Sequence, residues 1–139
     1  PDWLGGGDLL FVSRGSRYFA VCVDSPPAPA VCGPHLFHLT VKARELLMPE
    51  FLAWVVGQSP VQRQLLQAAS GSLQLSVTRQ ALEALEIPLP SLATQRVVTD
   101  LAAAAARERA VLTALIQNRE LQLEALASAL AAGQPMNLT

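Results

Sequence analysis

The residues of this sequence best equipped to contact another molecule form one short polar segment, Ser13-Arg14-Gly15-Ser16-Arg17. Each of its two guanidinium groups can donate paired hydrogen bonds to a phosphate or to the edge of a guanine base. The two hydroxyl groups add further donors, and the glycine lets the backbone come close to a ligand. The segment is therefore a candidate DNA-contacting loop, and an ordinary polar turn is the alternative interpretation.

A second candidate contact is Gln74, which follows Gly71, Ser72 and Leu73. A glutamine side chain can make two hydrogen bonds to the edge of an adenine base. The alternative is that it lies on the solvent face of a strand. The predicted DNA-contacting residues are Ser13, Arg14, Ser16, Arg17 and Gln74.

The side chains that could bind a metal show no spacing typical of a metal site. They are Cys22, Cys32, His35 and His38. They include no Cys-x-x-Cys pair, and the two histidines would point to opposite faces of a strand. We expect small core thiols and surface imidazoles, with no bound metal.

No arrangement of residues indicates catalysis. The cysteines and serines do not stand in a nucleophile elbow or beside a paired base. Glu83 and Glu86 fit a solvated helix end better than an acid/base pair. The glycines at positions 5–7 precede a strand, which is the wrong order for a phosphate-binding loop. We expect no enzymatic activity and no cofactor.

Short elements in residues 1–90 must position these side chains. Apolar and β-branched runs predict three strands, at residues 8–12, 18–23 and 36–41. Their close spacing favours antiparallel pairing. The expected fold class is α+β, a small mixed domain of short, mostly antiparallel strands and helices.

Helical patterns follow the strands. Pro49 and Gly57 bound one predicted helix, and Pro60 and Gly71 bound the next. Alternation then predicts a half-buried strand over residues 72–77. A two-turn helix capped by Thr78 and an extended segment complete the domain, and these are expected over residues 79–85 and 86–89.

One long helix is predicted over residues 91–132, with a disordered tail over residues 133–139. Pro88 and Pro90 hold the entry extended, Ser91 is a suitable N-cap, and the next proline or glycine is Gly133. Apolar residues recur at alternating steps of three and four, which is typical of a coiled coil. The predicted helix-pairing residues are Leu112, Ile116, Leu123, Leu126 and Leu130.

The overall composition limits the possible functions. Ten basic and eleven acidic residues leave a net charge of −1, so affinity for nucleic acid through charge alone would be weak. Two cysteines are too few for a disulfide scaffold. No targeting segment or continuous apolar run of membrane-spanning length is visible, so we expect a soluble cytoplasmic protein without membrane partners.

Several short motifs follow one another along the chain. They are Gly7-Asp8-Leu9-Leu10-Phe11 with Arg14-Gly15, Pro34-His35-Leu36-Phe37-His38-Leu39, Pro49-Glu50-Phe51-Leu52, Gly71-Ser72, and Leu85-Glu86-Ile87-Pro88-Leu89-Pro90-Ser91-Leu92 with Thr94-Gln95. This order resembles the DNA specificity (S) subunit of type I restriction–modification systems over nearly the whole chain. The last motif, which opens the long helix, is the most specific.

The resemblance implies a target recognition domain that reads one half of a split DNA site, here without its N-terminal part. It implies that the long helix pairs with that of a second half and sets the spacing between half-sites. Implied partners are double-stranded DNA, methylation and restriction subunits, and a second copy or half-subunit. The methylation subunits of that family use S-adenosylmethionine. The alternative is a protein-interaction module that does not read DNA and docks its long helix onto specificity or methylation subunits.

Overall fold

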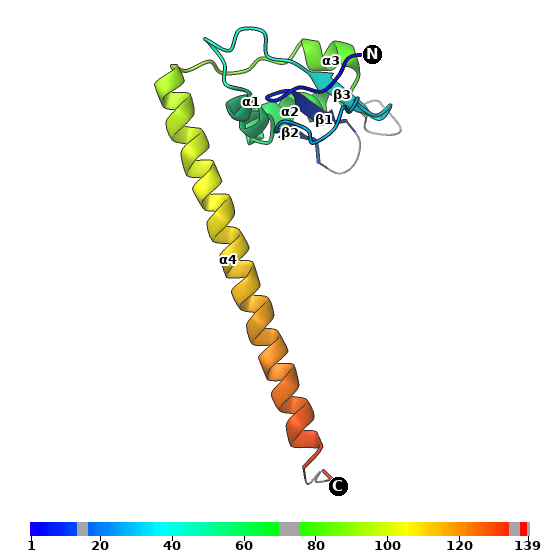
Figure 1. The fold of residues 1–139 in the computed structure, drawn as a ribbon, viewed down its shortest axis with the longest axis vertical. Helices are drawn as coiled ribbons and strands as arrows, with labels where there is room; N and C mark the ends of the chain where they lie inside the picture. The colour runs from blue at the N-terminus through cyan, green and yellow to red at the C-terminus, as the bar shows by residue number, and fades with distance from the viewer. Residues whose placement is uncertain (14–16, 70–75, 134–136, 139) are drawn as a thin grey trace. The chain divides into compact units, whose positions relative to one another are not determined.

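A computed structural model describes residues 1–13, 17–69, 76–133 and 137–138. Contacts divide the chain into two units, Pro1–Asp100 and Leu101–Thr139. Within the described residues, the first unit contains three strands, three short helices and the first turns of a long helix (Figure 1). The second contains the remainder of that helix. The α+β fold class predicted from the sequence is confirmed.

The three strands form one antiparallel sheet. They are β1 (Leu9–Val12), β2 (Phe19–Cys22) and β3 (Leu36–Leu39). Their order is β2-β1-β3, with Phe11 opposite Ala20 on one side and Phe37 on the other. The predicted antiparallel pairing is confirmed, and β1 is the central strand.

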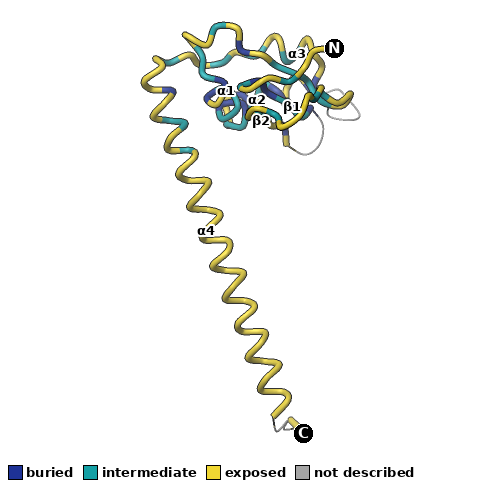
Figure 2. Tube along the Cα trace, in the orientation of Figure 1, coloured by how far each residue is buried: buried dark blue, intermediate teal, exposed yellow. Residues whose placement is uncertain are grey.

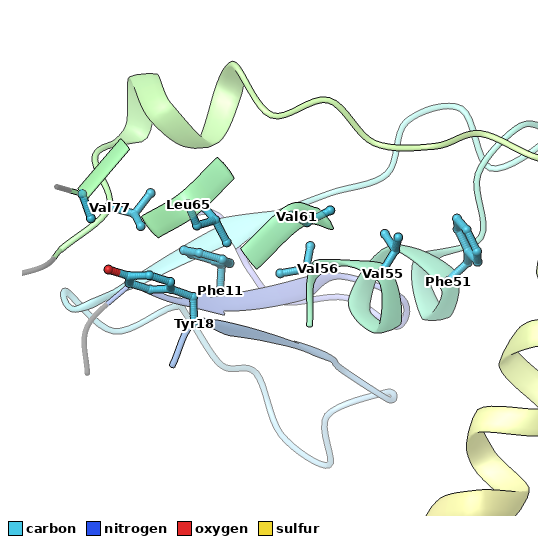
Figure 3. Packing of buried hydrophobic residues seen from close by; sticks show 9 residues of the cluster. Phe11, Tyr18, Phe51, Val55, Val56, Val61, Leu65 and Val77 are labelled. Atoms are coloured by element: carbon cyan, nitrogen blue, oxygen red, sulfur yellow. The ribbon is translucent and has the colours of Figure 1, made fainter. Parts of the chain in front are cut away.

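One face of the sheet carries the core of the first unit. Leu9 and Phe11 are completely buried, since alternate residues of a strand point to the same face. Helices α1 (Pro49–Val56) and α2 (Ser59–Ala69) supply the other side of the core. In Figure 3, Leu65 lies over the ring of Phe11, and Val61 lies above Val56. Burial of these side chains is the main force that holds the helices to the sheet.

The short helices begin and end close to the positions that the sequence predicts. Pro49 occupies the first turn of α1, and the backbone N–H of Gly57 donates to the carbonyl oxygen of Trp54 at its end. In α3 (Arg79–Glu83), the Thr78 hydroxyl accepts a hydrogen bond of 3.2 Å from the Ala81 N–H, as an N-cap does. This helix is shorter than predicted, because its last turn closes at Ala84.

Most of the strand predicted over residues 72–77 lies outside the described residues. Ser76 and Val77, which are described, are not in a strand. Val77 is buried, and its N–H donates to the carbonyl oxygen of Ser13 at 3.2 Å. This contact ties the segment before α3 to the end of β1.

The long helix α4 runs from Leu92 to Ala131, 40 residues, which corresponds to about 60 Å at 1.5 Å per residue. Its N-cap is Ser91, whose hydroxyl accepts from the Thr94 N–H at 3.2 Å. Its forty residues are all described, and one of them, Gln95, is buried. In Figure 2 the exposed colour is continuous along α4 from residue 103 to its end, after intermediate positions in its first turns. The boundaries predicted from Ser91 and Gly133 agree with those observed.

Candidate nucleic-acid interface and helix-pairing face

The polar loop predicted to contact DNA connects β1 to β2. Residues 14–16, and with them Arg14 and Ser16, lie outside the described residues, as does Gln74. Ser13 is buried, and its carbonyl oxygen is held by the Val77 N–H. Ser13 therefore stabilises the end of β1, and its side chain is not exposed to a ligand.

Arg17 is the described member of this loop that is open to solvent. Its Nη2 lies 3.5 Å from the carbonyl oxygen of Gly57, at the turn between α1 and α2. Within the described residues two ion pairs form, Asp8 with His38 and Arg79 with Glu83, and Arg17 belongs to neither. Its guanidinium charge is therefore available to an anionic ligand.

A glutamine that was not predicted as a site residue connects Tyr18, the residue after Arg17, to the end of α1. The Nε2 of Gln62 donates to the carbonyl oxygens of Tyr18 and Val56, each at 2.8 Å. Tyr18 itself is buried. These contacts fix Tyr18, and the Val77 N–H contacts Ser13 in the same way. No local sequence signal identifies the role of Gln62, because its two partners are far from one another in the chain.

The histidine and cysteine predictions need correction. His38 is not a surface imidazole, since its Nε2 lies 2.8 Å from the carboxylate Oδ2 of Asp8 in a largely buried pair. The N–H of Gly5, followed by the His38 hydrogen bond, lowers the pKa of Asp8 below its usual value. Cys22 and Cys32 are free and half-buried, so they are not core thiols. Burial raises the pKa of the Cys22 thiol, which disfavours a reactive thiolate.

No group of three or more metal-ligating side chains comes together among the residues that the structure describes. His35 is exposed on the approach to β3, whereas His38 is engaged with Asp8. In that same part of the chain, no helix combines the length and the apolar character needed to cross a lipid bilayer.

The predicted helix-pairing residues expose large apolar surfaces. The exposed fractions of these side chains lie between 51% and 77% for Leu112, Ile116, Leu123, Leu126 and Leu130. Leu115 and Leu121 are also more than half exposed. Because water contact with so many leucines is unfavourable, such a helix gains stability when a partner covers this face.

The first turn of α4 is joined to the domain through Gln95, which is completely buried. Its Oε1 accepts from the N–H of Met48 at 2.8 Å. Its Nε2 donates to the carbonyl oxygens of Leu46 and Pro90, at 2.8 and 2.9 Å. The amide thus connects the segment before α1, the entry to α4 and the helix itself. Gln95 belongs to one of the sequence motifs, but no contact was predicted for it.

No protein-family model matches this chain, and no curated protein matches it significantly. The resemblance to type I specificity subunits therefore rests on the motifs in the sequence.

Proposed function

We propose that this chain is a DNA sequence recognition component of a type I restriction–modification complex. The single observation that carries the proposal is the motif around Pro88 and Pro90 that opens a 40-residue helix with an exposed apolar face, directly after a small α+β domain. In this proposal the domain contacts DNA, and α4 holds it at a fixed distance from a second recognition domain.

The proposed role requires no chemistry from this chain itself. Arg14 and Arg17 contact phosphates or guanine edges, while methylation and restriction subunits supply the reactions. Arg17 supports this proposal because its charge is exposed and the next residue, Tyr18, is buried and hydrogen-bonded to Gln62.

Helix pairing is the second part of the proposal. A second copy, or the helix of another half-subunit, covers the face that contains Leu112, Ile116 and Leu123. Arg109 and Arg119 interrupt the apolar repeat, and acidic residues of an antiparallel partner helix can neutralise them. Pairing of two such helices places the two recognition domains at opposite ends.

The DNA-binding role is tested by binding of a random-sequence duplex of about 30 base pairs over a range of salt concentrations. Each phosphate contact contributes about 0.9 to the slope of log affinity against log salt. The double variant Arg14→Ala/Arg17→Ala should therefore reduce the slope by roughly two and weaken binding at low salt. A matched control is Arg96→Ala/Arg107→Ala, which removes the same charge from exposed positions of α4 outside the apolar repeat.

The alternative is a protein-interaction module that docks through α4 and does not read DNA. The acidic balance of the chain, with a pI of about 6.1, favours this alternative. Equal and weak DNA binding by the native chain and by Arg14→Ala/Arg17→Ala would support the module over the DNA reader.

Sedimentation tests the pairing of α4 separately. At about 50 μM, the native chain should sediment as a dimer, and Leu123→Asp should shift it to the monomer, since a buried charge in the seam is costly. The control Leu121→Asp introduces the same charge outside the repeat of three and four, and should have the smaller effect. A native chain that is monomeric at this concentration, and unchanged by Leu123→Asp, would exclude pairing with a second copy.

A further inference from the structure

A groove in the first unit runs beside β3 and encloses a cavity of about 720 Å³. This volume is in the range of ligand-binding sites in proteins. One wall is β3 itself, and the opposite wall is formed by α3 and the extended segment that follows it, with Leu82, Leu85 and Ile87. Leu52 and Val56 of α1 form part of the floor. The groove is therefore predominantly apolar.

The wall formed by β3 is the edge of a sheet. The strand pairs with β1 on one side, in the order β2-β1-β3. On its other side, the N–H of Leu36 donates to the Gly33 carbonyl at 3.2 Å, and the carbonyl of Leu36 accepts from the Cys32 thiol at 3.4 Å. The backbone N–H and carbonyl of Leu36 thus point away from β1, and both are hydrogen-bonded to the preceding turn at Cys32 and Gly33.

The next outward-facing residue of the strand is His38. Backbone groups of an antiparallel strand alternate between its two neighbours, so a residue two positions after Leu36 also points its N–H and carbonyl away from β1. The side chain of His38 is held by Asp8 at 2.8 Å, on the sheet face opposite the core. Its backbone N–H and carbonyl therefore face the groove as one hydrogen-bonding pair.

The rim of the groove carries more negative than positive charge. Arg79 and Glu83 form an ion pair of 2.9 Å on the α3 side. Asp2 also lines the groove, and no described residue forms an ion pair with it. The rim thus carries one uncompensated negative charge beside an apolar interior.

We infer that this groove binds an extended, alternately apolar segment of a partner polypeptide, which adds to the sheet as a strand beside β3. The backbone of His38 supplies the pairing, and the apolar floor takes every second side chain of the segment. A basic residue of the segment faces Asp2. Helices and lipid chains would leave the backbone groups of His38 without partners, which disfavours them as occupants. The inference does not depend on the proposed role in DNA recognition.

The test uses a synthetic peptide, Lys-Val-Thr-Val-Thr-Val-Lys, with both ends blocked, and the complete chain labelled for amide NMR. Addition of peptide to about 2 mM should shift the His38 amide and slow its hydrogen exchange, since dissociation constants of such short strands are near millimolar. Two further peptides are N-methylated, one at the valines and the other at the threonines. Because each set of amides lies on one edge of the strand, one methylated peptide should bind at least tenfold more weakly and the other like the parent.

Three substitutions test whether the peptide binds in the groove. Leu85→Lys should weaken binding of the parent peptide at least tenfold, whereas Leu66→Lys, on an exposed part of α2 outside the groove, should leave it unchanged. Asp2→Lys changes an exposed rim residue without loss of core packing, and should weaken binding about threefold at low salt. Unchanged circular dichroism verifies that each variant is folded.

Three results would each overturn the inference. The first is no shift of the His38 amide in the native chain at the highest peptide concentration. The second is an equal effect of the two methylated peptides, whether both bind or neither does. The third is equal binding of the parent peptide by the native chain and by a folded Asp2→Lys variant at low salt.

Discussion

Replacement of Gln95 by alanine should uncouple the start of α4 from the domain. The native amide makes three hydrogen bonds, to Met48, Leu46 and Pro90, while completely buried. The alanine variant leaves one N–H and two carbonyl groups without these partners. A buried polar group that loses its partner costs about 1–3 kcal/mol. Because water can hydrogen-bond to some of these groups, we expect the free energy of unfolding to fall by about 3 kcal/mol in total.

Equilibrium unfolding in urea, followed by circular dichroism at a fixed protein concentration, measures this loss. A change of about 3 kcal/mol corresponds to a fall in melting temperature of roughly 10 °C for a chain of this size. The control Gln117→Ala removes an exposed amide from the same helix and should change stability by less than about 0.5 kcal/mol. Amide exchange should show that Met48 loses protection in Gln95→Ala and keeps it in Gln117→Ala.

A second variant, Gln95→Glu, tests whether the hydrogen bonds donated by the Nε2 of Gln95 contribute to stability. A carboxylate would face the carbonyl oxygens of Leu46 and Pro90, so burial raises the pKa of the introduced group. Its destabilisation is then largest at neutral pH and declines as the pH falls towards the ordinary glutamate value of about 4.3. A loss of less than about 1 kcal/mol in Gln95→Ala, with no pH dependence in Gln95→Glu, would refute this account of the contact.

Three further changes test individual contacts. Gly7→Ala should destabilise the chain by about 1 kcal/mol in thermal unfolding, because Gly7 has a φ of +86°, which residues with a side chain rarely adopt. Ser91→Ala removes the N-cap of α4 and should lower the unfolding free energy by about 1 kcal/mol, whereas Ser91→Asp should retain it. Asp8 has a lowered pKa because the Gly5 N–H donates to it, so its contribution is present above about pH 4 and lost at lower pH. The stability advantage of the native chain over Asp8→Asn should therefore shrink between pH 5 and about pH 2, and a constant difference would contradict this.

Elements specified by neighbouring residues could be predicted from the sequence. Pro49 and Gly57 bound α1, and Ser91 begins a helix that continues until the chain approaches Gly133. Short apolar runs predicted the three strands. Each of these signals acts through local backbone geometry or local side-chain spacing, which a sequence displays directly. The exposed leucines of α4 follow from the same periodic pattern.

Contacts between distant segments were decided by the tertiary structure. The sequence did not show that β3 pairs with β1, that Ser13 is buried, or that Asp8 holds His38. Gln95 binds backbone groups 47 and 49 positions away in the chain. Such pairings depend on which surfaces meet when the core forms, because a single glutamine or histidine carries no periodic signal of its partner. The sequence alone therefore determined that a long helix follows a small α+β domain, and the tertiary structure decided how Gln95 attaches its first turn.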